Sequence, residues 1–290
     1  ATGEVTRSVL ICFAHAGASA SAFDGWKDIL ASARVDIVAV ELPGHGTRRE
    51  GETIGVMATL VASVVDELAP LLHGSECRYH LLGASFGALL AHEVAHALAA
   101  RVGRAPSNLF VVSEAAPAVV SPDFDPAIED REFVNAAARL GEISAAIAAA
   151  GPDVWSVVLP PYRADLLAQQ NYCTVRDGGG ETARAAPKPK LTCPVYVFAG
   201  AEDAPLLRGG RDGPMLARWR ETTSSDTFET FVVDGGHLFF QTHAQSRGDL
   251  LALVAGCARG APSDAARRAP VPALRWVVHG ERAGSLHYTL

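Results

Sequence analysis

The sequence contains no long hydrophobic run. Nothing in its 290 residues approaches the 18 consecutive apolar residues of a membrane-spanning helix. The first eight residues also lack the charged and then apolar layout of a signal peptide. We therefore expect a soluble protein of the cytoplasm that has no membrane partner.

Basic runs, paired cysteines and dinucleotide motifs are missing as well. The formal net charge is −7, which argues against nucleic acid as the main partner. The five cysteines have no C-x-x-C spacing, so we expect reduced structural thiols with neither a zinc site nor a disulfide framework. No G-x-G-x-x-G follows the first apolar segment, which excludes a dinucleotide site there.

Strand-like and helix-like segments alternate along the first part of the chain. Residues 9–13, 35–40 and 79–82 are strand-like, and residues 22–33 and 54–72 are helix-like. Such alternation predicts crossover connections and a mostly parallel sheet with helices on both faces. With 49% apolar residues, the chain can form one large α/β domain.

A serine between two glycines is the most informative motif. The sequence G-A-S-F-G at 83–87 follows the strand-like residues 79–82 and precedes the helix-like residues 88–98. Strand, sharp turn and helix make a nucleophile elbow, in which small neighbours let strand and helix approach and the serine Oγ is exposed. In a chain with 27 glycines the motif also occurs by chance, and Ser85 could then be an ordinary turn serine.

Candidate partners for Ser85 lie downstream, after two further strand-like segments. Asp203 follows residues 195–198, and His237 follows residues 228–233. A serine hydroxyl needs an imidazole to take its proton and a carboxylate to hold that imidazole in the right tautomer. The chain order Ser, Asp, His is that of the α/β-hydrolase fold, so we predict this fold and this triad.

Other assignments remain open for the acid and the base. Glu202 adjoins Asp203 but should point elsewhere, and Glu114 follows the strand-like residues 109–112, where a relocated acid could lie. Asp203 could also be a helix cap, and His237 could be a loop histidine bonded to the backbone. We favour Asp203 because all three candidates occur in the order and at the strand ends that the fold requires.

An oxyanion hole needs two backbone N–H groups that point at the developing negative charge. The elbow supplies the N–H of Phe86, the residue after the nucleophile. We expect the second donor in the small residues that follow the first strand, and our candidate is the N–H of Ala16. His15 is interpreted as a loop-shaping residue, since the sequence offers it no acid partner.

The helix after the elbow contains the pattern H-E-x-x-H, formed by His92, Glu93 and His96. On a helix this pattern can bind zinc and supply a glutamate base. We consider a zinc site the less favoured alternative, because the helix must pack against the sheet and no third ligand is apparent. Neither a metal nor another cofactor is therefore expected.

The alternation of segments breaks between residues 115 and 171. This stretch is helical in composition and interrupted by prolines, with joints expected at Pro117, Pro122, Pro126, Pro152, Pro160 and Pro161. We interpret about 116–176 as a lid whose apolar side chains cover the pocket above Ser85 and exclude water. A plain helical subdomain would have the same composition. Residues 178–190 are expected to be a flexible joint.

Several motifs together resemble type II thioesterases, the editing hydrolases of polyketide and nonribosomal peptide assembly lines. They are F-A-H-A-G at 13–17, L-P-G-H-G at 42–46, P-Y-R-A-D at 161–165 and G-G-H-L-F-F at 235–240. The resemblance covers about residues 8–258. It implies an enzyme that cleaves acyl thioesters from the phosphopantetheine arm of acyl or peptidyl carrier proteins. The same resemblance implies an acyl-Ser85 intermediate.

The chain also departs from the family. Ala84 and Phe86 stand where the family usually has His and Met, which reshapes the acyl pocket in our interpretation. Residues 1–260 are assigned to the hydrolase domain, and 261–290 to an extension with a linker and a short hairpin. A monomer is expected, with the oligomeric state left open. Alternatives are an acyltransferase or cyclase, a carboxylesterase, or a non-catalytic carrier-binding protein.

Overall fold

The computed structural model describes residues 8–74, 77–122, 124–178, 188–208 and 213–260. The extension expected at 261–290 lies outside these residues, and so do residues 179–187 of the expected joint. The remaining expectations for strands and helices fall on described residues.

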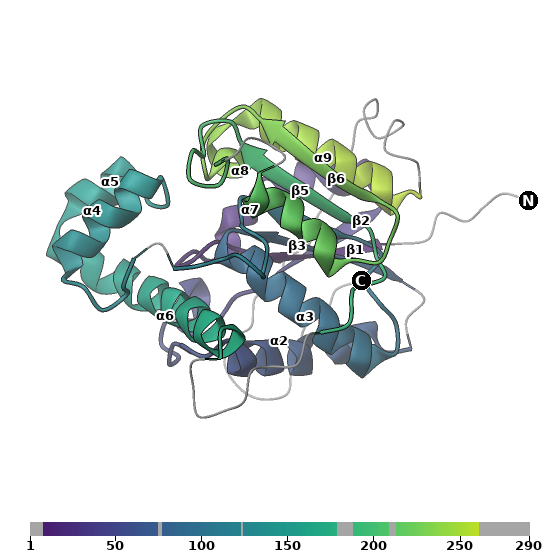
Figure 1. Ribbon diagram of the computed structural model, residues 1–290, viewed down its shortest axis with the longest axis horizontal. Coiled ribbons are helices and arrows are strands. Elements are labelled where there is room, and N and C mark those ends of the chain that lie inside the picture. Colours follow the sequence, from purple (N-terminus) through teal and green to yellow (C-terminus); the bar gives the residue numbers. More distant parts are fainter. Residues whose placement is uncertain (1–7, 75–76, 123, 179–187, 209–212, 261–290) are drawn as a thin grey trace, which may run out of the picture.

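A parallel β-sheet forms the centre of the described chain (Figure 1). Its six strands lie in the order β2-β1-β3-β4-β5-β6, and each neighbouring pair is parallel. This arrangement confirms the predicted mostly parallel sheet. The strands are β1 (Ser8–Phe13), β2 (Val35–Ala39), β3 (Arg78–Ala84), β4 (Leu109–Val112), β5 (Val195–Gly200) and β6 (Phe228–Val233).

Helices cover both faces of the sheet (Figure 1). Successive strand residues point to opposite faces, so Leu81 and Leu82 belong to two different hydrophobic cores. The core that contains Leu81 includes α2 (Met57–Leu72) and α3 (Phe86–Val102), which pack against each other. The other core includes α1 (Trp26–Leu30) and α9 (Ala244–Ala258).

The helix expected at 22–33 is interrupted in the structure. The chain forms the 3-10 helix η1 (Ala20–Phe23), then α1, then the 3-10 helix η2 (Ala31–Ala33). Gly25, between η1 and α1, has a φ of 76°. This is the left-handed region, which a right-handed helix cannot contain, so the chain turns at this glycine.

A helical insertion separates β4 from β5 and extends to one side of the sheet (Figure 1). It contains α4 (Asp130–Leu140), α5 (Ala145–Ala150) and α6 (Pro152–Arg176). The joints expected at Pro160 and Pro161 are wrong, because α6 runs through both prolines. Buried neighbours such as Leu159 and Tyr162 pack α6 against the rest of the molecule, and this packing overrides the weak helix propensity of proline.

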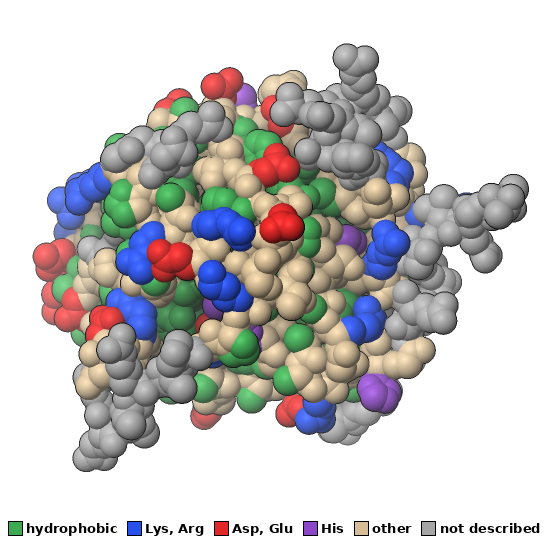
Figure 2. Space-filling view, turned by 45° about the vertical axis from the view of Figure 1, so that its right-hand side comes forward, with side chains coloured by type: hydrophobic (Ala, Val, Ile, Leu, Met, Phe, Trp, Pro, Cys, Tyr) green, Lys and Arg blue, Asp and Glu red, His purple; other side chains and the backbone are tan. Residues whose placement is uncertain are grey.

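The remaining elements are short, and the surface is mixed in charge. They are η3 (Gly46–Arg48), α7 (Pro214–Ala217), η4 (Arg218–Thr222) and α8 (Phe239–Thr242). On the face in Figure 2, Lys and Arg side chains lie among Asp and Glu side chains. Within the described ranges, the structure contains no helix with the length and apolar character needed to span a membrane.

Candidate active site

Ser85 occupies a strained turn between β3 and α3. Its backbone has φ 50° and ψ −130°, a conformation that costs energy for any residue with a side chain. A Cβ added at Gly83 would overlap the Gly87 carbonyl oxygen, and one added at Gly87 would overlap the carbonyl oxygens of Phe13 and Ala14. Both positions therefore require glycine. The turn has the geometry of a nucleophile elbow.

Asp203 and His237 meet in a direct hydrogen bond beyond the ends of β5 and β6. His237 Nδ1 lies 2.8 Å from Asp203 Oδ2, and the Asp203 side chain is 4% exposed. Gly200, the last residue of β5, has no room for a Cβ because the loop before His237 packs against it. This close approach brings the two loops together.

The ends of neighbouring strands bring Ser85 to the same edge of the sheet. Its N–H donates to the carbonyl oxygen of Val112, the last residue of β4, at 2.8 Å. His237 Nε2, the atom that faces away from Asp203, is buried and has no hydrogen-bond partner within the described part of the chain. The structure thus contains the hydrogen bond between Asp203 and His237, but His237 Nε2 makes no hydrogen bond to Ser85.

The other two carboxylates considered as the acid have different surroundings. Glu202 is exposed to solvent. Glu114 is buried, and its Oε1 accepts a hydrogen bond from the N–H of Ala115. Of the three carboxylates, Asp203 is the one hydrogen-bonded to the His237 ring.

Negative charge around His237 strongly favours its protonated form. Burial by itself disfavours the imidazolium, but the hydrogen bond that His237 donates to Asp203 and the charges of Asp203, Glu142 and Glu114 outweigh it. Together they raise the pKa of His237 to about 9. The ring therefore has a high affinity for a proton, which a general base needs.

The loop after β1 packs against the elbow. Because Gly87 touches the carbonyl groups of Phe13 and Ala14, the loop lies beside the first turn of α3, where Phe86 begins the helix. The N–H of Ala18 donates to the His15 carbonyl oxygen at 3.0 Å, so residues 15–18 form a tight turn. Ala16 lies within that turn.

His15 is partly buried beside the catalytic candidates, and its Nδ1 atom is inaccessible to solvent. Its ring meets the Phe240 ring edge-on, with 6.0 Å between the centroids. Burial and the positive charge of His237 lower the pKa of His15 to about 4. An imidazole with so low a pKa binds a proton weakly, so His15 fits the loop-shaping interpretation better than that of a base.

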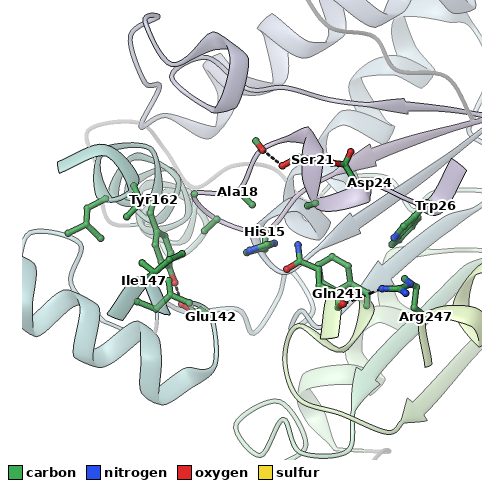
Figure 3. A pocket seen from close by; sticks show the side chains of 18 residues that line it. His15, Ala18, Ser21, Asp24, Trp26, Glu142, Ile147, Tyr162, Gln241 and Arg247 are labelled. Carbon is green, nitrogen blue, oxygen red and sulfur yellow. Dashed lines mark hydrogen bonds between the residues drawn. The ribbon is translucent and has the colours of Figure 1, made fainter. Parts of the chain in front are cut away.

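Two cavities lie beside this site. A cavity of about 550 Å³ runs between the loop after β1 and the insertion, from Ile147 and Tyr162 to Trp26 and Arg247 (Figure 3). A smaller cavity of about 170 Å³ is lined by Asp203 and His237, among others. Glu142, in the turn after α4, borders both cavities.

Sequence reasoning missed Glu142. Tyr162 on α6 donates a hydrogen bond from its hydroxyl group to Glu142 Oε2, and Glu142 adds to the negative charge around His237. No motif in the sequence surrounds Glu142. Its place depends on the packing of α4 against α6.

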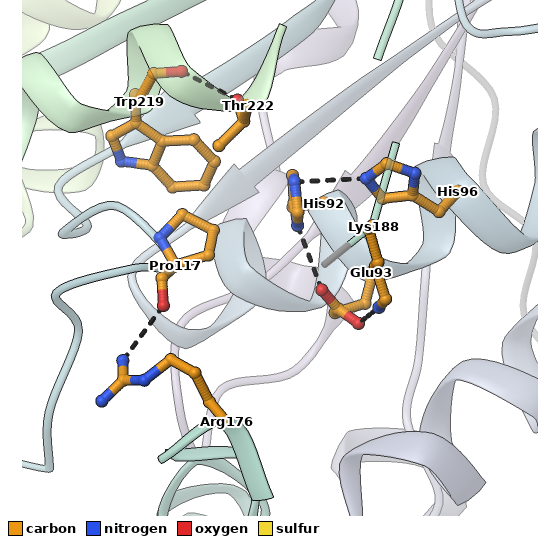
Figure 4. A network of polar contacts seen from close by, with 8 residues as sticks. All are labelled: His92, Glu93, His96, Pro117, Arg176, Lys188, Trp219 and Thr222. Carbon is orange, nitrogen blue, oxygen red and sulfur yellow. Dashed lines mark hydrogen bonds and ion pairs between the residues drawn. The ribbon is translucent and has the colours of Figure 1, made fainter. Parts of the chain in front are cut away.

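The H-E-x-x-H residues form a polar network on α3 (Figure 4). His92 Nδ1 lies 3.1 Å from Glu93 Oε1, His96 Nε2 lies 3.3 Å from His92 Nε2, and Lys188 pairs with Glu93. Burial, reinforced by the charge of Lys188, lowers the pKa of His92 to about 3. In the ranges that the structure describes, no three His, Cys, Asp or Glu side chains are grouped to hold a metal ion.

The parallel sheet, the strained serine turn and the Asp–His pair together define an α/β-hydrolase. Residues 8–251 match the family model of the thioesterase domain. The chain therefore belongs to the thioesterase family, and it is an enzyme of the thioester hydrolase class. This result confirms the resemblance to type II thioesterases.

Relatives by sequence and by structure support this assignment. The chain is 31% identical over 232 residues to thioesterase PikA5 from Streptomyces venezuelae, which covers 79% of this chain and 74% of that protein. It is 32% identical to RedJ, the thioesterase of the prodiginine biosynthetic pathway in Streptomyces coelicolor, with a TM-score of 0.71 and coverage of 87% and 91%. The type II thioesterase BorB of the borrelidin cluster is 25% identical, with a TM-score of 0.67 and coverage of 88% and 94%.

Proposed function

We propose that this thioesterase hydrolyses acyl groups bound as thioesters to the phosphopantetheine arm of acyl or peptidyl carrier proteins. The observation that carries the chemistry is the 2.8 Å bond between His237 and Asp203 at the strand ends beside Ser85. The relatives named above include the thioesterases of the prodiginine biosynthetic pathway and of the borrelidin biosynthetic cluster, which supports a carrier-bound substrate. We further propose that the enzyme is a cytoplasmic monomer that acts together with a polyketide or nonribosomal peptide assembly line.

In the proposed mechanism, Ser85 Oγ attacks the thioester carbon while His237 Nε2 takes the hydroxyl proton. Asp203 holds His237 Nδ1 and stabilises the imidazolium. The N–H groups of Ala16 and Phe86 stabilise the oxyanion of the tetrahedral intermediate. The C–S bond then breaks, and the thiolate takes the proton from His237. A water molecule activated by His237 hydrolyses the acyl-Ser85 ester and regenerates the serine.

The insertion acts as a lid in this proposal. Ile143, Ile147, Val158 and Leu159 line the larger cavity from the side of the insertion. An apolar wall suits an acyl chain and keeps bulk water away from the thioester. The carrier-bound arm would reach Ser85 beneath α4 and α6.

The test is intact-protein mass spectrometry of an acyl-loaded carrier protein incubated with wild-type enzyme or with Ser85→Ala. We expect the wild type to remove the acyl mass and Ser85→Ala to lose at least about a thousandfold in rate. The matched control is Ser107→Ala, at the opposite end of the sheet, which should keep full activity. Near-full activity of Ser85→Ala would overturn the mechanism.

The same assay separates the alternative activities. Transfer of the acyl group to an added alcohol or amine, in place of water, would indicate an acyltransferase. Preference for an oxygen ester over the carrier thioester would indicate a carboxylesterase. Failure of a serine-directed phosphonate to label Ser85 would favour a carrier-binding protein without activity.

A further inference from the structure

A buried carboxylate of the insertion contacts the loop that we assign to the oxyanion hole. Asp165 lies on α6, and its side chain is 2% exposed. Its Oδ2 accepts a hydrogen bond from the Gly17 N–H at 2.9 Å and lies 3.0 Å from His45 Nε2. A single oxygen atom thus connects α6 with the loop after β1 and the loop after β2.

Hydrogen-bond accounting determines the charge of His45. Its Nδ1 lies 2.9 Å from the Pro43 carbonyl oxygen, which can only accept, so Nδ1 carries a hydrogen. Its Nε2 faces the Asp165 carboxylate and carries a hydrogen as well. Burial opposes this charge, but the bond to Asp165 raises the pKa of His45. His45 and Asp165 therefore form a buried ion pair.

The turn at residues 15–18 depends on the orientation of one peptide group. Gly17 has a φ of 73°, and Ala16 has no positive φ, which identifies a type II turn. Type I and type II turns differ mainly in the direction of their central peptide, here the one between Ala16 and Gly17. Asp165 accepts the N–H of this peptide. A flipped peptide would bring the Ala16 carbonyl oxygen against the carboxylate, which would repel it.

A second side chain of α6 closes the other side of the turn. Tyr162 precedes Asp165 by three residues, so both side chains lie on the same face of the helix. A Cβ added at Gly17 would lie 2.6 Å from the Tyr162 Cβ, which shows how closely α6 packs there. The turn is therefore held by a packing contact and by a charged hydrogen bond from one helix.

We propose that Asp165 is a positioning residue for the oxyanion hole, because it anchors the turn at residues 15–18, which carries the donor N–H of Ala16, to α6. The inference rests on the proposed function of that loop. Without this anchor the whole turn can shift relative to α6, so the position of the Ala16 N–H beside the elbow depends on the carboxylate. The insertion would then complete the catalytic site as well as cover it.

The test compares Asp165→Ala with the wild type on a short acyl thioester of N-acetylcysteamine and on an alkyl boronic acid. The boronic acid forms a tetrahedral adduct with the serine and so reports on the oxyanion hole. We expect kcat and the boronic acid affinity to fall together by about 10- to 100-fold, with KM changing less than about threefold. Asp165→Asn keeps an acceptor oxygen and should recover at least about tenfold of this loss.

The matched control is Arg163→Ala on the same helix. Arg163 bonds to the Pro126 carbonyl oxygen and to Asp130 and does not contact the turn at residues 15–18. The Arg163→Ala variant should loosen the insertion without weakening the boronic acid adduct. Equal losses in Arg163→Ala and Asp165→Ala, or an unchanged boronic acid affinity in Asp165→Ala, would overturn the inference.

Two further outcomes distinguish a failure of the inference from a failure of the proposed function. If Asp165→Ala does not fold, Asp165→Leu, which keeps the side-chain size but has no acceptor oxygen, carries the same comparison, and wild-type boronic acid affinity in Asp165→Leu would overturn the inference. A wild type that binds the boronic acid but hydrolyses no carrier thioester would contradict the proposed function alone. A fully active wild type with an equally active Asp165→Ala would contradict only the positioning role.

Discussion

At the scale of single residues, His237 lies among three carboxylates. Asp203 bonds to it directly, and Glu142 and Glu114 add negative charge. With a pKa of about 9, the ring is mostly protonated at neutral pH, whereas a general base must be neutral. The rate of acylation should therefore rise with pH until His237 has lost its proton.

Glu142→Gln tests the effect of the insertion on this proton. Removing one negative charge should lower the pKa of His237, so the acid limb of kcat/KM should move to lower pH by roughly half a unit to one unit. Activity at pH 7 should increase as a result. The pH profile of thioester hydrolysis measures this shift.

The control for this prediction is Glu132→Gln, an exposed carboxylate on α4. Its profile should coincide with that of the wild type. An unchanged limb in Glu142→Gln would mean that the insertion does not influence the base.

At the scale of elements, the elbow depends on the packing of α3 against β1. Gly87 faces the carbonyl groups of Phe13 and Ala14 without room for a methyl group. Gly87→Ala should destabilise the protein by roughly 1–3 kcal/mol, because the added carbon forces strand and helix apart. It should also lower kcat, since the same contact sets the elbow beside the loop after β1. Urea unfolding and thioester kinetics measure the two effects.

Gly248→Ala is the matched control within α9. A Cβ at Gly248 meets nothing within 4 Å, so alanine should raise the free energy of unfolding by roughly 0.5–1 kcal/mol. Equal stability changes in the two variants would show that the elbow tolerates the extra carbon.

At the scale of the whole molecule, several neutral histidines couple stability to pH. Burial lowers the pKa of His15, His80 and His96 to about 4 and that of His92 to about 3. Their pKa values in the unfolded chain are near 6.5, so the unfolded state binds more protons below this value. The stability that these groups contribute is complete above pH 6.5 and is lost as the pH falls toward 4.

His80→Gln should reduce the loss of stability at acid pH. His80 is 1% exposed and lies 2.8 Å from Asn108 Nδ2, so at pH 4 its removal should spare roughly 2–3 kcal/mol of proton-linked destabilisation. Urea unfolding between pH 4 and pH 7 measures the slope. The exposed His73 provides the control, because His73→Gln should leave the slope unchanged. A slope that is the same in both variants would exclude His80 as a source of the acid sensitivity.

The sequence alone determined the features that depend on local pattern. Apolar runs and turn residues predicted all six strands; the four inner strands β1, β3, β4 and β5 are almost completely buried, as expected for a parallel sheet with helices on both faces. Glycines at 83 and 87 predicted the elbow at Ser85, because the turn tolerates no Cβ there. The strand ends predicted the meeting of Asp203 with His237, which the structure confirms.

Tertiary structure decided what depends on contacts between distant segments. The prolines of α6 looked like joints, yet burial of that helix keeps it continuous. The carboxylates of Glu142 and Asp165 reach the site only because the insertion packs beside β1, some 120 or more residues away in the chain. Local sequence patterns cannot predict such contacts, because each segment has the same helix or turn propensity whether or not its distant partner is present.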